Sequence, residues 1–201
     1  MEGKLARAYD MLFSGYLKPI RKKIMHIARK YECKSIVDLG CGTGQQCIML
    51  FKQGFQVVGV DASPHMINFA RKNSPKEIKY VLSDILSFDA KNTFDCVILA
   101  FVLHGNNAEK QRKILEKMKG MIKDDGIVII ADYGKPENIK GKLMNILIKI
   151  VEGMAAKEHS RNYKLYVKNG GLRWIMKKQN IIEHYAFYGG AIRIVVLSNS
   201  S

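Results

Sequence analysis

Short apolar runs alternate with longer segments of helical periodicity between residues 34 and 132. Strand and helix patterns that alternate in this way are typical of a parallel α/β sheet. The fourth apolar run is almost wholly apolar, as expected of a strand that is covered on both faces. The predicted strands are Lys34–Leu39, Phe55–Val60, Ile78–Ser83, Phe94–Ala100 and Ile127–Asp132.

Helices are predicted in the segments between these strands. Thr43–Gln53 and Asn107–Ile122 both have helical periodicity. Another helix is expected to begin at Ser63 and Pro64. Serine is suited to cap a helix, and proline is tolerated in the first turn.

Further helices are predicted on both sides of this core. Leu5–Tyr31 has the pattern of one or two amphipathic helices. Lys140–Lys157 predicts one long amphipathic helix, and Leu172–Gln179 predicts another helix after it.

The last part of the chain has the pattern of a β-hairpin. The predicted strands Asn180–Tyr188 and Ala191–Leu197 are joined by Gly189 and Gly190, a pair typical of tight turns. We therefore expect a single domain over residues 1–201, with N-terminal helices in 1–33, a core in 34–132, and helices and a hairpin in 133–201.

A glycine-rich segment, VDLGCGTG at Val37–Gly44, lies where the first strand gives way to the first helix of the core. Closely spaced glycines allow backbone angles that side chains forbid, and they let the backbone approach a ligand. Such a turn indicates a nucleotide-like ligand, and by itself it would suit a dinucleotide-binding dehydrogenase as well as other proteins.

Two features of this loop argue against a dinucleotide. The dinucleotide fingerprint is Gly-x-Gly-x-x-Gly/Ala, but Gln45 stands at the third position and the third glycine comes early, at Gly44. The carboxylate of Asp38 would repel a pyrophosphate, whereas it would attract the ammonium group of S-adenosylmethionine, which has no phosphate. The loop therefore favours S-adenosylmethionine.

Two further aspartates follow the next strands along the chain. Asp61 ends the second strand, where an acidic residue is suited to accept hydrogen bonds from both ribose hydroxyls. Asp84 follows the third strand and is placed to accept from an adenine amino group, with Ile85 packing on the ring. Three acids at successive strand ends meet at the carboxyl edge of the sheet, where α/β proteins bind ligands.

These features resemble those of the class I S-adenosylmethionine-dependent methyltransferases. The resemblance covers about Ser35 to Asp132, and it includes Ser83-Asp84-Ile85 and the strand exit at residues 99–104, LAFVLH. It implies a Rossmann-like, mostly parallel sheet of seven strands, with an antiparallel last strand next to the fifth, helices on both faces and an N-terminal helical lid. Within the class, the chain is similar to the small methyltransferases related to ubiquinone and menaquinone biosynthesis C-methyltransferases, through its layout and an early Tyr9-Asp10.

The resemblance also implies roles for individual residues. Gly40, Gly42 and Gly44 would line the methionine end of the cofactor, Asp61 would hold the ribose, and Asp84 would face the adenine. The full set of predicted cofactor-binding residues is Asp38, Gly40, Cys41, Gly42, Gly44, Asp61, Ala62, Asp84, Ile85 and Ala100.

His104 and Tyr9 are the candidate catalytic residues. His104 follows the fourth strand, so it could take a proton from an acceptor, or it could orient the backbone or pack beside the adenosine. Tyr9 lies in the predicted lid, where it could close the site or pack within its helix.

The charge of the chain leaves the methyl acceptor open. With 33 Lys and Arg against 18 Asp and Glu, the net charge is +15, which suits an anionic partner or a solvated basic surface. A small, lipophilic or quinone-like molecule is the first candidate. Basic amphipathic stretches at Lys18–Lys30 and Lys140–Lys157 could lie on an anionic membrane, although such helices usually pack on their own domain.

Nucleic acid is the second candidate acceptor. The fourth-strand exit lacks the Asn/Asp-Pro-Pro-Tyr/Phe turn of amino-directed enzymes on DNA and RNA, and no Pro-Cys turn for cytosine carbon chemistry is present. A nicotinamide-binding oxidoreductase and an inactive cofactor-binding module also remain open.

The cysteines and the chain start indicate the compartment. Four cysteines include no Cys-x-x-Cys pair and no His-rich partner segment, so we predict buried free thiols and no metal site. No apolar run reaches the roughly 20 residues that span a bilayer, and the first residues do not resemble a signal peptide. We expect a cytoplasmic protein.

Overall fold

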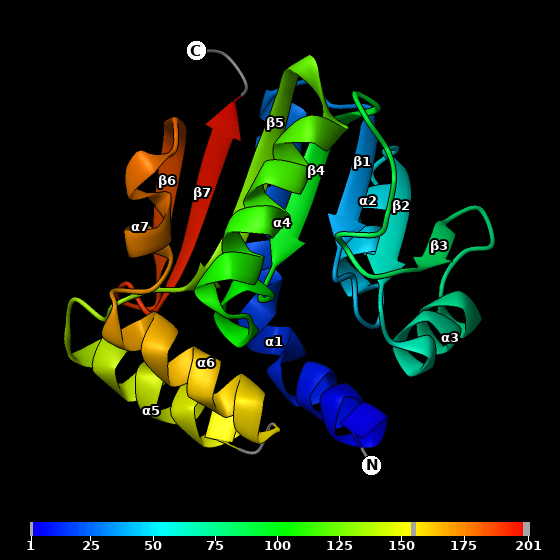
Figure 1. Ribbon diagram of the computed structural model, residues 1–201. Helices are drawn as coiled ribbons and strands as arrows, with labels where there is room; N and C mark the ends of the chain where they lie inside the picture. Colours follow the sequence, from blue (N-terminus) through cyan, green and yellow to red (C-terminus); the bar gives the residue numbers. More distant parts are fainter. Residues whose placement is uncertain (1, 154–155, 199–201) are drawn as a thin grey trace.

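A single seven-stranded sheet forms the centre of the computed structural model, which describes residues 2–153 and 156–198 (Figure 1). The strand order is β3-β2-β1-β4-β5-β7-β6. β1 to β5 pair in parallel, and β7 inserts antiparallel between β5 and β6. The strands are β1 (Ser35–Leu39), β2 (Gln56–Asp61), β3 (Lys79–Leu82), β4 (Phe94–Ala100), β5 (Ile122–Tyr133), β6 (Ile181–Phe187) and β7 (Ile192–Ser198).

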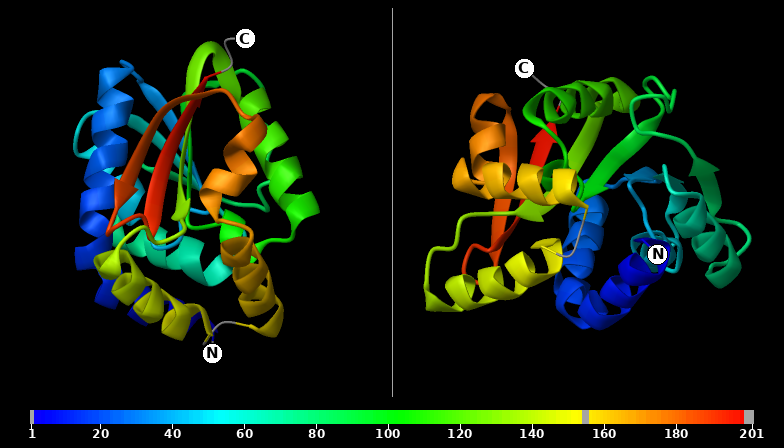
Figure 2. Two further views of the ribbon diagram at one scale, coloured as in Figure 1. Left: turned by 90° about the vertical axis from the view of Figure 1, so that its left-hand side faces the viewer. Right: turned by 60° about the horizontal axis from the view of Figure 1, so that its bottom comes forward.

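Helices cover both faces of this sheet. α1 and α2 lie on one face, whereas α4 and α7 lie on the other (Figure 2). The α-helices are α1 (Glu2–Lys30), α2 (Gln45–Phe51), α3 (Pro64–Asn73), α4 (Ala108–Met121), α5 (Ile139–Gly153), α6 (Lys157–Lys168) and α7 (Leu172–Ile175), with the 3-10 helices η1 (Leu103–Gly105) and η2 (Met176–Lys178). The predicted Rossmann-like sheet with an antiparallel last strand is therefore confirmed.

Local signals placed most of these elements correctly. The strand predicted over Phe94–Ala100 has the observed ends, and Ser63 caps α3 by accepting a hydrogen bond from the Met66 N–H at 3.4 Å. Asn107 caps α4 in the same way, by accepting from the Lys110 N–H at 2.9 Å. Short polar side chains at these positions satisfy backbone donors that the first helical turn leaves unpaired.

Other predictions of element bounds were wrong. The helix predicted from Lys140 to Lys157 ends at Gly153, and a separate helix, α6, follows it. β5 begins five residues earlier than predicted, at Ile122 rather than Ile127. The early start of β5 reflects pairing of Ile122 with Phe94 on β4, a contact between distant segments that local periodicity does not show.

α1 packs on the sheet through one apolar stripe. Ile20, Ile24, Ile27 and Ala28 recur at helical spacing and are buried. Pro19 lies inside the helix, which is nevertheless one continuous element instead of the two helices that the sequence also allowed. This packing holds α1 against the sheet beside the carboxyl end of β1.

Several helices lie at the carboxyl edge of the parallel strands. The first half of α1, α3, α5 and α6 all gather below this edge, and α5 lies side by side with α6 (Figure 1). Among the described residues, no helix combines the length and the apolar character needed to cross a bilayer. This edge contains the candidate site.

Candidate active site

The loop between β1 and α2 has a backbone that only glycine adopts readily. Gly40, Gly42 and Gly44 have positive φ angles of 71°, 54° and 80°. A Cβ atom at Gly44 would lie 2.4 Å from the hydroxyl oxygen of Tyr80, but a Cβ atom at Gly42 would meet no protein atom within 4 Å. Gly44 therefore serves packing, whereas Gly42 faces open space.

Hydrogen bonds hold this loop against the end of β2. The N–H groups of Gly40 and Cys41 both donate to the Val60 carbonyl, at 2.7 and 3.0 Å. The Gly42 N–H donates to Asp61 Oδ2 at 2.9 Å, and the Ser63 N–H donates to Asp61 Oδ1 at 2.8 Å. The carboxylate of Asp61 thus joins the glycine loop to the start of α3.

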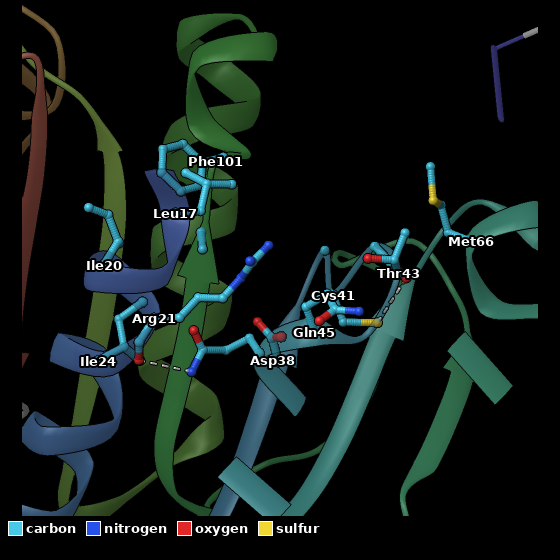
Figure 3. Close-up of a pocket in the computed structure, with 14 residues that line it drawn as sticks. Leu17, Ile20, Arg21, Ile24, Asp38, Cys41, Thr43, Gln45, Met66 and Phe101 are labelled. Atoms are coloured by element: carbon cyan, nitrogen blue, oxygen red, sulfur yellow. Dashed lines mark hydrogen bonds between the residues drawn. The ribbon is translucent and has the colours of Figure 1, made fainter. Parts of the chain in front are cut away.

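A cavity of about 290 Å³ lies between this loop and α1 (Figure 3). α1 supplies one wall and Phe101 closes another, at the end of β4. Phe101 has a positive φ of 59°, which is uncommon for an aromatic residue. The lining residues are Leu17, Ile20, Arg21, Ile24, Asp38, Gly40, Cys41, Gly42, Thr43, Gln45, Gln46, Met66, Ala100 and Phe101.

Opposite charges meet in this cavity. Asp38, the penultimate residue of β1, is almost fully buried, and its Oδ2 accepts a hydrogen bond from the Cys47 thiol at 3.4 Å. Burial raises the pKa of Asp38 to about 7 although the Cys47 hydrogen bond and the charge of Arg21 act in the other direction. The Arg21 side chain extends from α1 into the space between Phe101 and Asp38 (Figure 3).

Asp84 holds a different position, outside the residues that line the cavity. Its Oδ1 accepts the Leu86 N–H at 2.9 Å, and its Oδ2 is 3.2 Å from the Lys110 ammonium. The backbone hydrogen bond and the lysine outweigh the effect of burial and lower the pKa of Asp84. The carboxylate is therefore ionised at neutral pH. Its neighbour in sequence, Ile85, is buried.

The structure brings together about half of the predicted cofactor set. Asp38, Gly40, Cys41, Gly42 and Ala100 line the cavity. The remaining predicted residues lie around it: Gly44 turns toward Tyr80, Asp61 joins the loop to α3, Ala62 is exposed, and Asp84 and Ile85 follow β3. The roles of these residues toward the cofactor stay predictions.

His104 lies in a buried polar cluster rather than in the cavity wall. Its Nδ1 is 2.8 Å from Asp132 Oδ1, and its Nε2 is 3.4 Å from Glu152 Oε2. Burial alone would lower the pKa of His104, but the two carboxylates outweigh it and raise the pKa to about 10. An imidazole that is protonated at neutral pH cannot accept a proton, so this arrangement disfavours the predicted role as general base.

Tyr133 lies between this cluster and Phe101 in the cavity wall. Its ring lies 5.5 Å from the Phe101 ring and 4.6 Å from the His104 ring, measured between centroids. Its hydroxyl donates to Glu152 Oε1 at 2.7 Å. The histidine cluster is thus separated from the cavity by a layer of two aromatic rings.

The remaining candidate, Tyr9, belongs to α1, but its side chain lies outside the described residues. Sequence reasoning missed Arg21 and Gln46, although Leu17, Ile20, Arg21 and Ile24 share one helical face. It also missed Asp132 and Glu152 as partners of His104, since a pairing across elements leaves no local signal.

Comparison with known proteins agrees with this geometry. A family described as a methyltransferase domain matches residues 32–184. An uncharacterized methyltransferase of Alkaliphilus oremlandii is 31% identical over 138 residues, which cover 68% of this chain and 63% of that protein. This chain therefore spans less than two thirds of that relative.

Solved structures show the same fold. An O-methyltransferase family protein from Burkholderia thailandensis has a TM-score of 0.72 at 14% identity, covering 98% of this chain and 60% of that one. Magnesium protoporphyrin IX methyltransferase from Synechocystis, solved with bound S-adenosylhomocysteine, has a TM-score of 0.62 at 17% identity, covering 90% and 83%.

The chain belongs to the methyltransferase-domain family. The predicted class, the class I S-adenosylmethionine-dependent methyltransferases, is confirmed by this match and by the Rossmann-like sheet. S-adenosylmethionine is the methyl donor of that class.

Two glycine substitutions distinguish an effect on ligand binding from an effect of backbone strain on stability. Gly42→Ala and Gly54→Ala both place a methyl group at positive φ with no protein atom within 4 Å. We expect each to reduce the free energy of unfolding by about 1–2 kcal/mol in urea titrations. Only Gly42→Ala should weaken S-adenosylhomocysteine binding, by at least about 10-fold in calorimetry. Equal affinities in the two variants would show that the ligand does not occupy the space at Gly42.

Proposed function

We propose that this protein transfers a methyl group from S-adenosylmethionine to a small, lipophilic acceptor such as a quinone-like ring. The observation that carries the first part is the cavity at the glycine loop, in which a buried carboxylate faces a guanidinium. The acceptor class rests on an exposed apolar stripe at the same edge of the sheet.

The residues of the cavity fit the amino-acid end of the cofactor. That end carries one ammonium and one carboxylate group, and Asp38 and Arg21 offer the complementary charges. Gln46 Oε1, on the same cavity wall, is buried and has no hydrogen-bond partner among the described residues. A buried acceptor without a partner costs free energy, which a donor from the ligand would recover.

The residues around the cavity fit the nucleoside end. Asp61 is held by two backbone N–H groups and keeps lone pairs for the ribose hydroxyls. Asp84, with Ile85 beside it, would accept from the adenine amino group, as the sequence predicted.

When bound, S-adenosylmethionine supplies a methyl group that is already activated on a sulfonium. The chain therefore needs to orient the two reactants and to exclude water. Leu17, Ile20 and Phe101 give the cavity apolar walls, and α1 covers it from one side. Orientation of this kind can supply roughly 7–11 kcal/mol of the barrier.

His104 takes no proton in this mechanism. Its ring is buried between Asp132 and Glu152, behind Phe101 and Tyr133. The proton of an acceptor hydroxyl would leave to solvent or to another base at the mouth of the cavity.

The acceptor class is supported by α5. Ile139, Leu143, Ile146, Leu147 and Ile150 are 45–75% exposed and lie on one face of this helix. Gly141, Ile148 and Glu152 lie on the opposite, buried face. The stripe expected from sequence thus faces outward, whereas amphipathic helices usually turn such a stripe toward their own domain.

Basic residues flank this stripe on both sides. Lys140 lies on one side of it, and Lys142 and Lys149 lie on the other, all three of them exposed. An apolar stripe between lysines suits a helix that lies on an anionic lipid surface, where the ammonium groups reach the headgroups. We therefore propose that α5 docks on an anionic membrane, from which a lipophilic acceptor would enter.

The binding of the cofactor product should depend on pH through Asp38. The raised pKa means that a protonated Asp38 stabilises the apo fold below about pH 4, a contribution that is lost as pH rises through about 7. The ammonium of S-adenosylhomocysteine needs the ionised form, so its affinity should rise about 30-fold from pH 5.5 to pH 8.

Two controls make this calorimetric measurement specific. Methylthioadenosine lacks the amino-acid end, and its affinity should stay flat over this range. Asp38→Asn should lower the affinity for S-adenosylhomocysteine at pH 8 and remove the pH dependence. A pH dependence that persists in Asp38→Asn would contradict the assignment of Asp38 to the ammonium.

The stripe on α5 should control binding to vesicles. Sedimentation with vesicles that contain phosphatidylserine should show binding that weakens with salt. The double variant Ile146→Gln and Ile150→Gln should bind at least about 10-fold more weakly, because it removes two apolar anchors. The matched control, Ile181→Gln with Ile182→Gln, changes two exposed isoleucines on β6 and should bind like the wild type. Equal loss in both variants would count against α5 as the docking helix.

The acceptor class can be tested with methyl-labelled S-adenosylmethionine. We expect label to enter the organic phase when the protein is incubated with a total lipid extract, and not to enter transfer RNA or duplex DNA. The net charge of +15 makes nucleic acid the alternative acceptor. Label in RNA or DNA, with none in lipid, would replace the lipophilic acceptor by that alternative.

A further inference from the structure

The buried cluster around His104 contains an arrangement that the proposed function does not use. His104, Glu152 and His159 each offer one ligand atom, and these atoms all lie within 4.8 Å of one another. They come from η1, α5 and α6, three separate elements at the carboxyl edge of the sheet. The three residues do not follow a metal-binding sequence motif. The prediction of no metal site was based on the spacing of the cysteines, and none of the cysteines belongs to this cluster.

We propose that His104, Glu152 and His159 form a binding site for a first-row divalent transition-metal ion such as Zn²⁺ or Fe²⁺. Two imidazoles and one carboxylate suit these ions, whereas Mg²⁺ and Ca²⁺ prefer oxygen ligands alone. Three protein ligands leave room for a water in a further position. The site goes beyond the proposed function and does not depend on it.

All three separations between ligand atoms lie within 4.8 Å, and two of them are near the tetrahedral value or below it. Bonds of about 2.0–2.1 Å to zinc separate tetrahedral ligand atoms by roughly 3.3 Å. His104 Nε2 and Glu152 Oε2 are already 3.4 Å apart. His159 Nε2 and the same oxygen are 2.7 Å apart, a hydrogen-bond distance that would open by roughly 0.6 Å to reach the tetrahedral separation.

Surrounding residues orient each ligand as metal sites require. Asp132 lies 2.8 Å from Nδ1 of His104, so this nitrogen can donate there and leave Nε2 for the ion. Asp132 is itself held by the Tyr133 N–H at 2.7 Å. The Tyr133 hydroxyl donates to Glu152 Oε1, which leaves Oε2 directed at the two histidines.

The charges also favour a cation in the cluster. Asp132 and Glu152 place two carboxylates at side-chain exposures of 1% and 7%. Buried carboxylates need a compensating positive charge, which the protonated His104 supplies when no ion is bound. A divalent ion would displace that proton to solvent and would supply two charges in its place. The His159 side chain, 37% exposed, gives an ion a path from solvent.

Gly105 gives the ring of His159 the space that it occupies. A Cβ atom at Gly105 would lie 2.5 Å from Nδ1 and Cε1 of that ring. The Asn162 side chain, on α6, donates to the Gly105 carbonyl at 3.0 Å and so holds α6 against η1. Gly105 is therefore a positioning residue for the third ligand.

The test is a titration of chelator-treated protein with Co²⁺, followed by the visible d–d absorption of the ion. We expect one Co²⁺ per chain, displacement by Zn²⁺, and a higher Tm with Zn²⁺. His159→Ala should weaken Co²⁺ binding by at least about 100-fold, and Gly105→Ala by about 10-fold or more. His159→Cys should restore binding with a sulfur-to-cobalt charge-transfer band.

His184→Ala is the matched control, because it removes an exposed histidine on β6 and should bind Co²⁺ like the wild type. S-adenosylhomocysteine binding in each variant reports that the chain is folded, and circular dichroism does so if that ligand fails to bind. Two results would overturn the metal site: no d–d absorption in the wild type, or the same absorption in folded His159→Ala.

Discussion

The hydrogen bond from the Gly42 N–H to Asp61 Oδ2 is the contact on which the site depends. It holds the turn after β1 against the end of β2, and the same carboxylate holds the first residue before α3 through the Ser63 N–H. The loop can follow this path only because Gly40, Gly42 and Gly44 accept positive φ angles. Adjacent parallel strands bring the two segments to one edge, so the sheet order is a precondition of the site.

The burial of Asp38 gives the cavity its chemical preference. Burying an ionised carboxylate costs free energy unless a positive charge lies beside it. For Asp38 this cost is highest when the cavity holds no cationic ligand. Arg21 on α1 supplies positive charge from the opposite wall. A ligand end that carries both an ammonium and a carboxylate satisfies both side chains, whereas a pyrophosphate would satisfy only the arginine. The cavity and the family match therefore agree on the donor.

Local sequence patterns were enough to predict the sheet and the glycine loop. Alternating apolar runs place strands such as Phe94–Ala100, and a glycine turn after a strand needs no information from elsewhere in the chain. Caps such as Ser63 are equally local. The position of Asp38 at the strand end followed from the same short segment.

Local sequence patterns could not predict contacts between segments that are distant in the chain. Arg21 lines the same cavity as Asp38 because α1 lies against the sheet beside the β1–α2 loop, and Glu152 lies 3.4 Å from His104 because α5 returns to the edge of the sheet where η1 lies. The periodicity of α5 showed a stripe but not the side of the helix that faces the protein. His104 was placed at the correct edge, but its two carboxylate partners, which change its chemistry, came from elements far along the chain.

A calorimetric comparison of S-adenosylhomocysteine with NAD on the same protein at pH 8 tests the identity of the cavity's ligand. We expect S-adenosylhomocysteine to bind with one site per chain and NAD to give no measurable heat, because its pyrophosphate would face the Asp38 carboxylate. Binding of NAD, with none of S-adenosylhomocysteine, would contradict this expectation.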